Sequence, residues 1–121
     1  MAQKILIIED SMYMSTLLSD ALTAAGYEVV GQAANGEAGI DMALEMEPDL
    51  ITLDNILPDM IGLDILKVIK DEEHLKSKVI MISAVGQESV VQQGLALGAE
   101  DYILKPFTSD QVISAVKKAF A

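Results

Sequence analysis

The run Lys4-Ile5-Leu6-Ile7-Ile8, followed at once by Glu9 and Asp10, is the pattern on which the fold depends. A nearly continuous apolar run of this length is typical of a strand that is covered on both faces of a parallel sheet. Similar runs recur along the chain, at residues 28–31, 50–53, 78–83 and 101–104. The sequence therefore predicts five short and largely buried strands.

Segments with helical periodicity separate these runs. Gly26 ends the first segment and Gly98 ends the fourth, as expected for glycine just beyond a helix. The predicted helices cover residues 11–25, 36–46, 63–73 and 88–97, and the last one begins at Thr108 or Ser109 and ends at Phe120. Five strand-then-helix units indicate an α/β fold with a doubly wound, five-stranded parallel sheet, (βα)5, and we expect residues 1–121 to form one domain.

The composition excludes several classes of function. The 121 residues carry 8 Lys and 19 Asp or Glu, so the formal net charge is −11. This charge argues against a nucleic-acid partner, because affinity for nucleic acid comes mainly from basic side chains. The absence of cysteine excludes disulfides and a thiolate metal site. The longest apolar runs are too short to cross a bilayer, and the N-terminus lacks a signal-peptide pattern, so we expect a cytoplasmic protein without membrane contact.

Polar residues with complementary chemistry follow four of the five predicted strands. In open α/β sheets the carboxyl ends of the strands meet at one edge, and ligands bind there. The second predicted strand, ending at Gly31, contributes nothing to this set. The residues at the other strand ends are Glu9, Asp10, Asp54, Ser83, Lys105 and Pro106.

This set of residues predicts a site for a cation and an oxyanion. Clustered carboxylates repel one another unless a cation is present, and oxygen ligands select a hard cation such as Mg²⁺, with Mn²⁺ as an alternative. Lys105 can pair with a carboxylate or a phosphoryl oxygen, and Ser83 can donate to the same oxygen. Asp54 lies on the central strand, and a carboxylate can act as a phosphoryl-accepting nucleophile.

A simpler interpretation exists for each acid taken alone. An acid at the end of a strand is often the N-cap of the next helix, and Asp10 or Asp54 could have this role. A cap requires neither two adjacent acids nor Lys and Ser at neighbouring strand ends, so the whole set favours the site.

These residues resemble the receiver domain of two-component response regulators. The resemblance covers the whole chain with the spacing of the family, and it implies a flavodoxin-like fold with strand order 2-1-3-4-5. Because no effector domain is present in the 121 residues, the chain is similar to the single-domain chemotaxis members of this family. The motifs that carry the resemblance are Glu9-Asp10, Asp54, Pro58-Asp-Met-Ile-Gly62, Ser83-Ala84, Gly98-Ala99, Tyr102 and Lys105-Pro106-Phe107.

The resemblance implies a role for each matching residue. Asp54 would accept a phosphoryl group from the phosphohistidine of a sensor kinase. Mg²⁺ would be bound by Asp10, by Glu9 through a water molecule, by Asp54 and by the backbone carbonyl of Ile56. The phosphoryl oxygens would be held by Lys105 and Ser83, with Ala84 beside them in the same site.

A second group of implied roles concerns signalling. Movement of Ser83 toward the phosphoryl group would allow Tyr102 to turn inward and so change the surface formed by the fourth helix, the fifth strand and the fifth helix. Alternatively, Tyr102 has no role in signalling, and its aromatic side chain only packs against the edge of the sheet. The Lys105–Pro106 peptide bond would be cis, which is almost exclusively a proline conformation.

The chain departs from the family pattern at several positions. Glu9 replaces the Asp of many members, Ser83 replaces Thr, and Ile61 replaces a common Asn. Ile56 and Val85 are apolar where the chemotaxis regulators of enteric bacteria carry polar groups, and both positions flank the path of an attacking water. We therefore expect slower hydrolysis of the phosphorylated Asp54.

Three functions follow, of which the first is favoured. The first is a phosphorylation-controlled, monomeric binding module that is not an enzyme, with a sensor histidine kinase, a phosphatase and an output protein such as the flagellar motor switch as partners. The second is a relay intermediate that passes its phosphoryl group to a histidine phosphotransferase. The third, a Mg²⁺-dependent phosphatase with an aspartyl-phosphate intermediate, is disfavoured because Ile56 occupies the place of the second acid that such enzymes need.

Overall fold

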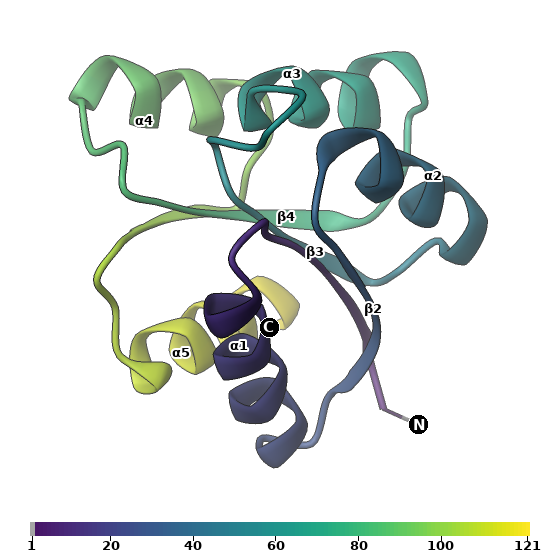
Figure 1. The fold of residues 1–121 in the computed structure, drawn as a ribbon, viewed down its shortest axis with the longest axis vertical. Coiled ribbons are helices and arrows are strands. Elements are labelled where there is room, and N and C mark those ends of the chain that lie inside the picture. Colours follow the sequence, from purple (N-terminus) through teal and green to yellow (C-terminus); the bar gives the residue numbers. More distant parts are fainter. Residues whose placement is uncertain (1) are drawn as a thin grey trace.

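Five apolar strands pair in parallel in the computed structural model, which describes residues 2–121. Their order in the sheet is β2-β1-β3-β4-β5 (Figure 1), which confirms the predicted order and the flavodoxin-like fold. The strands are β1 (Lys4–Ile8), β2 (Glu28–Ala33), β3 (Leu50–Leu53), β4 (Lys78–Ser83) and β5 (Asp101–Leu104).

Helices cover both faces of this sheet (Figure 1). Helices α1 (Met12–Ala24) and α5 (Ser109–Phe120) lie on one face. The other face carries α2 (Gly36–Met46), α3 (Gly62–Lys67), the π-helical segment η1 (Val68–Glu72) that continues α3, and α4 (Glu88–Ala96). Each helix follows a strand in sequence, so the loops that leave the carboxyl ends of the strands gather at one edge of the sheet.

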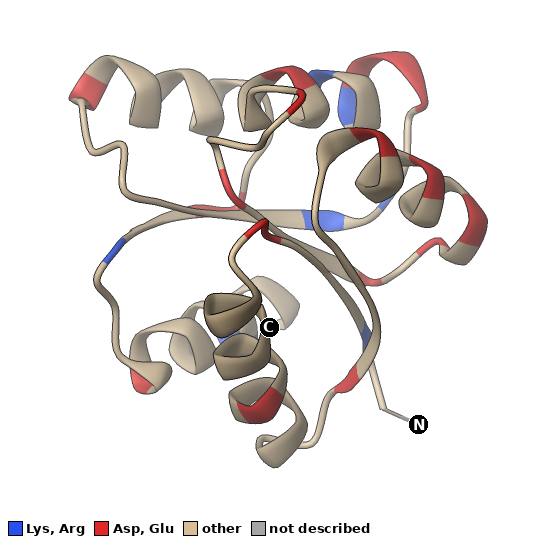
Figure 2. Cartoon of the chain, in the orientation of Figure 1, with Lys and Arg blue, Asp and Glu red and all other residues tan. Residues whose placement is uncertain are grey.

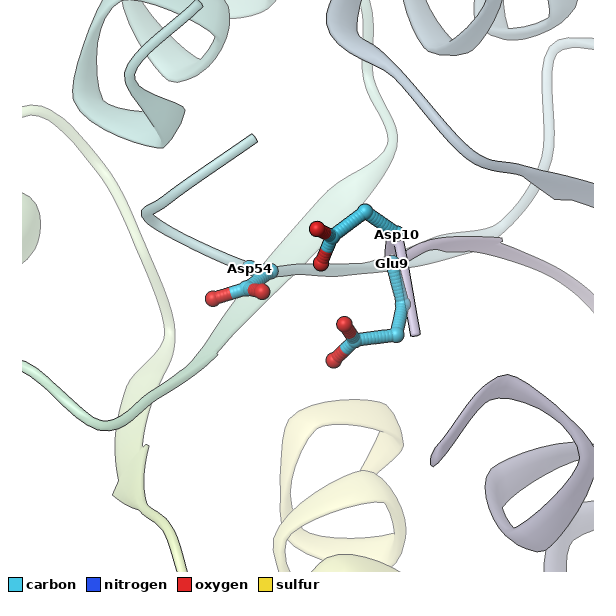
Figure 3. A group of neighbouring side chains, drawn as sticks. All are labelled: Glu9, Asp10 and Asp54. Carbon is cyan, nitrogen blue, oxygen red and sulfur yellow. The ribbon is translucent and has the colours of Figure 1, made fainter. Parts of the chain in front are cut away.

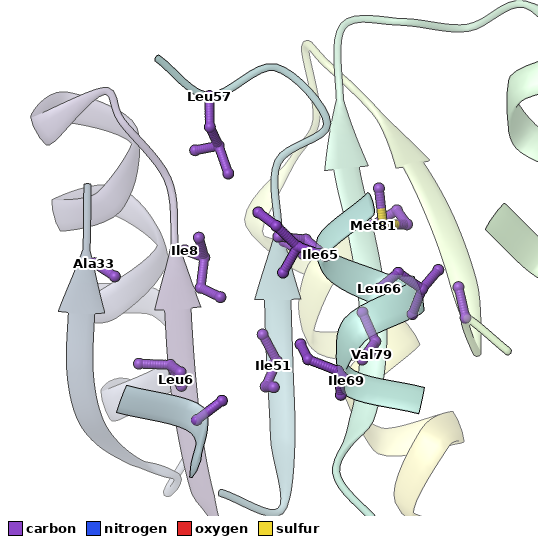
Figure 4. Packing of buried hydrophobic residues seen from close by; sticks show 13 residues of the cluster. Leu6, Ile8, Ala33, Ile51, Leu57, Ile65, Leu66, Ile69, Val79 and Met81 are labelled. Carbon is purple, nitrogen blue, oxygen red and sulfur yellow. The ribbon is translucent and has the colours of Figure 1, made fainter. Parts of the chain in front are cut away.

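Two hydrophobic cores fill the space between the sheet and its helices. Alternate strand residues such as Leu6, Ile51 and Val79 pack beneath α2 and α3 (Figure 4). The intervening residues, such as Ile7 and Ile80, pack beneath α1 and α5. Because the central strands are buried on both faces, most of their successive residues are apolar, which explains why the runs in the sequence are continuous rather than alternating.

The predicted end of the second strand and the predicted type of the third helix are wrong. The second strand continues past Gly31 to Ala33, because Gln32 and Ala33 pair with Ile7 and Ile8 of β1. The single helix predicted for residues 63–73 is α3 followed by the wider turns of η1, in which the Glu73 amide donates to the Val68 carbonyl at 2.8 Å.

The first residues of α1 and α3 show whether Asp10 and Asp54 act as N-caps. Ser11 is the N-cap of α1, since its Oγ accepts a hydrogen bond from Met14 N at 3.3 Å. The N-cap of α3 is Ile61. Asp10 and Asp54 therefore cap neither helix, and the cap interpretation is wrong for both.

Acidic residues are distributed over the helical layers, notably along α2 and around η1 (Figure 2). Within residues 2–121, no helix has the length and apolar character needed to cross a membrane.

Candidate functional site

The carboxyl ends of β1 and β3 bring three acids together. Glu9, Asp10 and Asp54 each offer a carboxylate oxygen, and these oxygens lie within 4.8 Å of one another (Figure 3). Glu9 and Asp54 are buried, with 4% and 6% of their surface exposed, whereas Asp10 is open to solvent. The sequence prediction that these acids meet at one edge is therefore correct.

Lys105 compensates part of this negative charge. Its Nζ lies 2.6 Å from Glu9 Oε1 and 3.3 Å from Asp54 Oδ2. Partial burial by itself lowers the pKa of Lys105, but the hydrogen bond with Glu9 and the charges of Asp54 and Glu9 outweigh burial and hold the pKa above its ordinary value. Lys105 is thus a permanent cation beside Asp54. The Lys105–Pro106 peptide bond is cis, as expected.

Glu9 has both carboxylate oxygens engaged within the protein. Besides the contact of Oε1 with Lys105, Oε2 accepts a hydrogen bond from Ser11 N at 3.0 Å. Asp10 differs, because no hydrogen bond or ion pair to its carboxylate occurs within residues 2–121. The two adjacent acids therefore have distinct environments, with Glu9 oriented by the protein and Asp10 free to bind a cation.

Ser83 and Tyr102 belong to β4 and β5, which lie on the side of β3 away from β1. Ser83 is fully buried at the end of β4, and its Oγ accepts a hydrogen bond from Val85 N at 3.1 Å. The Tyr102 hydroxyl donates to the Val85 carbonyl at 2.7 Å, and the ring packs partly buried against the core beneath α3 and α4. Burial raises the pKa of the phenol, so Tyr102 is neutral. Val85 thus contacts both Ser83 and Tyr102, the two residues for which the resemblance implies a coupled movement.

The loop after β3 brings the backbone of Ile56 to the site. Ile56 N donates to Asp54 Oδ1 at 3.4 Å. Within residues 2–121 no hydrogen bond to the Ile56 carbonyl oxygen occurs, so this oxygen is available as a ligand. Gly62 N donates to Asn55 O at 2.6 Å and closes the base of the loop.

These groups fit a divalent metal ion. The donors are oxygens, which Mg²⁺ prefers. Three carboxylates and one ammonium leave two uncompensated negative charges, which match the charge of the ion. The residues available to hold it are Asp10, Asp54, the Ile56 carbonyl and, through water, Glu9.

Two further residues near this site make hydrogen bonds that the sequence alone does not indicate. Asn55 is buried, and its Oδ1 accepts a hydrogen bond from Leu63 N at 3.2 Å, at the start of α3. Asp59 accepts hydrogen bonds from the first turn of α2. Asp59 lies within the matched segment between Pro58 and Gly62, but no pattern in the sequence shows which helix it would reach.

Comparison with known proteins gives a consistent result. The family model "Response regulator receiver domain" matches residues 5–117. The chain is 41% identical over 118 residues to the chemotaxis protein CheY of Bacillus subtilis, covering 98% of each chain. It is 38% identical over 119 residues to sporulation initiation phosphotransferase F of the same organism, covering 98% of this chain and 94% of the relative.

Solved structures show the same likeness. A chain in the crystal structure of the CheX–CheY–BeF₃–Mg²⁺ complex from Borrelia burgdorferi matches with a TM-score of 0.94 and 32% identity. The match covers 98% of the present chain and 90% of that chain.

Proposed function

The chain belongs to the response regulator receiver domain family, and from this premise we propose that it is a phosphorylation-controlled signalling module whose phosphoryl acceptor is Asp54. Receiver domains are signalling components of two-component systems. The observation that carries the proposal is the convergence of Asp54 with Asp10, Glu9 and Lys105 at one edge of the sheet.

In the proposed reaction, an oxygen of the Asp54 carboxylate attacks the phosphorus of a phosphohistidine on a sensor kinase. The new O–P bond forms as the N–P bond breaks, and the imidazole leaves with the bonding electron pair. Phosphoryl transfer depends chiefly on positioning and on neutralising charge. Lys105 supplies a fixed positive charge 3.3 Å from Asp54 Oδ2, and Ser83 and Ala84 lie at the end of the neighbouring strand to receive the phosphoryl oxygens.

The same proposal includes a Mg²⁺ ion, with Mn²⁺ as a substitute, held by Asp10, Asp54, the Ile56 carbonyl and, through water, Glu9. When bound, the ion supplies charge neutralisation for the transferred group. The Mg²⁺ and BeF₃ in the Borrelia burgdorferi complex support this assignment by analogy.

We assign the output to the surface formed by α4, β5 and α5. The Tyr102 hydroxyl and the Ser83 hydroxyl both contact Val85, which offers a short path from the phosphoryl site to this surface. The relatives named CheY favour a role in chemotaxis. For that role we propose a flagellar motor switch as the output partner and a kinase and a phosphatase that act on Asp54.

We also propose that the chain acts as a single receiver domain, a monomer in the cytoplasm that signals through its own surface and is not an enzyme with turnover. The similarity to two proteins named CheY covers 98% of their own length, which supports the single-domain role.

The test is incubation with acetyl phosphate and Mg²⁺, followed by intact-mass measurement. We expect one phosphoryl group on the wild type, none on Asp54→Asn, and wild-type modification of the control Asp20→Asn, which changes an exposed acid on α1. Modification of Asp54→Asn would contradict the assignment of the acceptor. Continuous release of phosphate over many turnovers would instead favour a phosphatase.

The similarity to sporulation initiation phosphotransferase F favours a second candidate function, an intermediate in a phosphorelay. Mixing the phosphorylated protein with a histidine phosphotransferase distinguishes the two. Rapid transfer of the label supports the relay, and retention of the label supports a terminal signalling module.

A further inference from the structure

The carboxylate of Asp59 joins two separate elements next to the phosphoryl site. Its Oδ1 accepts a hydrogen bond from Gly36 N at 2.7 Å, and its Oδ2 accepts one from Glu37 N at 3.0 Å. Both donors lie in the first turn of α2, where N–H groups have no partner inside the helix and negative charge is favoured. These hydrogen bonds lower the pKa of Asp59, so its carboxylate is charged at neutral pH.

Helix α2 already has an ordinary N-cap without Asp59. Asn35 has this role, because its Oδ1 accepts a hydrogen bond from Ala38 N at 2.8 Å. The contacts of Asp59 come from the loop between β3 and α3, a distant part of the chain. They therefore tie that loop to α2 in addition to capping the helix.

Packing reinforces this connection. Gly36 lies directly against Met60, the residue after Asp59, and a Cβ on Gly36 would come within 2.8 Å of the Met60 sulfur. The loop and the start of α2 can approach this closely only because residue 36 is glycine.

The loop itself is short and internally hydrogen-bonded. Leu57 N donates to Met60 O at 3.2 Å near its tip, and Ile56 and Ile61 form an antiparallel bridge. Asp59 lies at the tip, whereas Ile56 lies near the base, next to Asp54. These contacts, with the hydrogen bond from Gly62 N to Asn55 O, join the tip to the base of the loop, where the Ile56 carbonyl lies.

We propose that Asp59 is a positioning residue for the metal site: by holding the loop tip against α2, it keeps the Ile56 carbonyl where it can bind Mg²⁺ together with Asp10 and Asp54. This inference rests on the proposed function, since it concerns the metal site assigned there. Asp59 touches neither the metal nor the phosphoryl group and acts through the backbone of Ile56.

The test is a Mg²⁺ titration of the full chain without a phosphoryl donor, followed by NMR of the backbone amides. We expect Asp59→Ala to raise the dissociation constant of Mg²⁺ about tenfold, the lower end of the effect seen when groups that orient metal ligands are removed. The response of the Ile56–Leu57 amides to Mg²⁺ should diminish as well, because the intervening carbonyl is no longer held in place.

Asn35→Ala is the matched control. It removes a side-chain hydrogen bond from the same turn of α2 but leaves the loop after β3 untouched. We expect the control to bind Mg²⁺ with nearly the wild-type constant. If Asp59→Ala does not fold, Asp59→Asn, which keeps the shape and loses the charge, takes its place in the comparison.

A rise in the dissociation constant that is larger for the Asp59 variant than for Asn35→Ala supports the inference, and a rise that is equal or smaller overturns it. If the wild type itself binds no Mg²⁺, the proposed function fails and this inference fails with it. Normal binding by the wild type and equal constants for the variants would overturn the role of Asp59 alone.

Discussion

Thr52 is a residue whose side chain conflicts with its surroundings. It is buried in β3 between Ile7 of β1 and Ile80 of β4, and within the described residues its hydroxyl has no hydrogen-bond partner. An unpaired buried hydroxyl costs about 1–3 kcal/mol. We expect Thr52→Val to raise the free energy of unfolding by about 1 kcal/mol, as measured by urea denaturation. Thr52→Ala should instead be destabilised by the cavity it leaves, and a Thr52→Val variant less stable than the wild type would refute the explanation.

Ile56 has a side chain that is 56% exposed although its backbone belongs to the candidate metal site. If its apolar side chain fails to orient the attacking water, Ile56→Asn should shorten the lifetime of phosphorylated Asp54. The expected change is about fivefold, corresponding to one hydrogen bond of about 1 kcal/mol in the transition state. The lifetime is followed by the loss of the phosphoryl group from purified, phosphorylated protein.

Ile61→Asn is the control for this experiment, because Ile61 pairs with Ile56 across the loop and is 50% exposed. It should keep the wild-type lifetime. Equal lifetimes for Ile56→Asn and the wild type would show that this position does not govern hydrolysis.

At the scale of the elements, two helical glycines are expected to respond in opposite ways to the same substitution. A Cβ on Gly39 of α2 would lie 2.7 Å from Cδ1 of Ile8 and 3.0 Å from its Cγ1, so Gly39→Ala should destabilise the protein by about 1–3 kcal/mol. A Cβ on Gly94 of α4 would come no closer than 3.4 Å to Tyr102, so Gly94→Ala should stabilise α4 by up to about 1 kcal/mol. Thermal unfolding of both variants provides the measurement, and shifts of the same sign would contradict this account of the packing.

The link between Asp59 and α2 predicts a dependence of stability on pH. The pKa of Asp59 is lowered below 3.8 by the hydrogen bonds from Gly36 and Glu37. A lowered pKa in the folded state stabilises the protein above the unfolded-state pKa, and this contribution is lost as the pH falls through the folded-state pKa. The difference in unfolding free energy between wild type and Asp59→Asn should therefore be constant from neutral pH to about pH 5 and shrink below pH 3.8.

Asn35→Ala serves again as the comparison, because Asn35 does not titrate. Its difference from the wild type should change little over the same range of pH. A difference for Asp59→Asn that is independent of pH down to the acid transition would exclude a charged contact with α2.

At the scale of the whole molecule, three of the acids that give the net charge of −11 meet at the sheet edge. A divalent ion that binds only the folded chain should stabilise it, by about 1.4 kcal/mol at ten times the dissociation constant. Asp10→Asn should be more stable than the wild type without metal, because it relieves repulsion among carboxylates, and it should lose the response to Mg²⁺. Thermal unfolding with and without Mg²⁺ tests both effects.

Asp20→Asn, which changes an exposed acid of α1, is the control and should keep the full response to Mg²⁺. An Asp10→Asn variant that is still stabilised by Mg²⁺ would place the ion elsewhere.

The fold and the meeting of the acids at one edge of the sheet could be predicted from the amino-acid sequence alone. Strands buried on both faces are mostly apolar, so runs such as the one from Ile5 to Ile8 are visible without a structure. In a parallel sheet the carboxyl ends share one edge, so Asp10, Asp54 and Lys105 could be assigned to one place from their positions after predicted strands.

The partner of each charged group could not be predicted, because these contacts join residues far apart in the chain and depend on side-chain direction. The structure shows that Lys105 lies closer to Glu9 than to Asp54. It also shows that Asp59 accepts a hydrogen bond from the first turn of α2. The end of β2 was also mispredicted, because Gly31 suggests that the strand stops there. In the structure, Met42 of α2 packs over Gly31, and pairing with β1 continues the strand to Ala33.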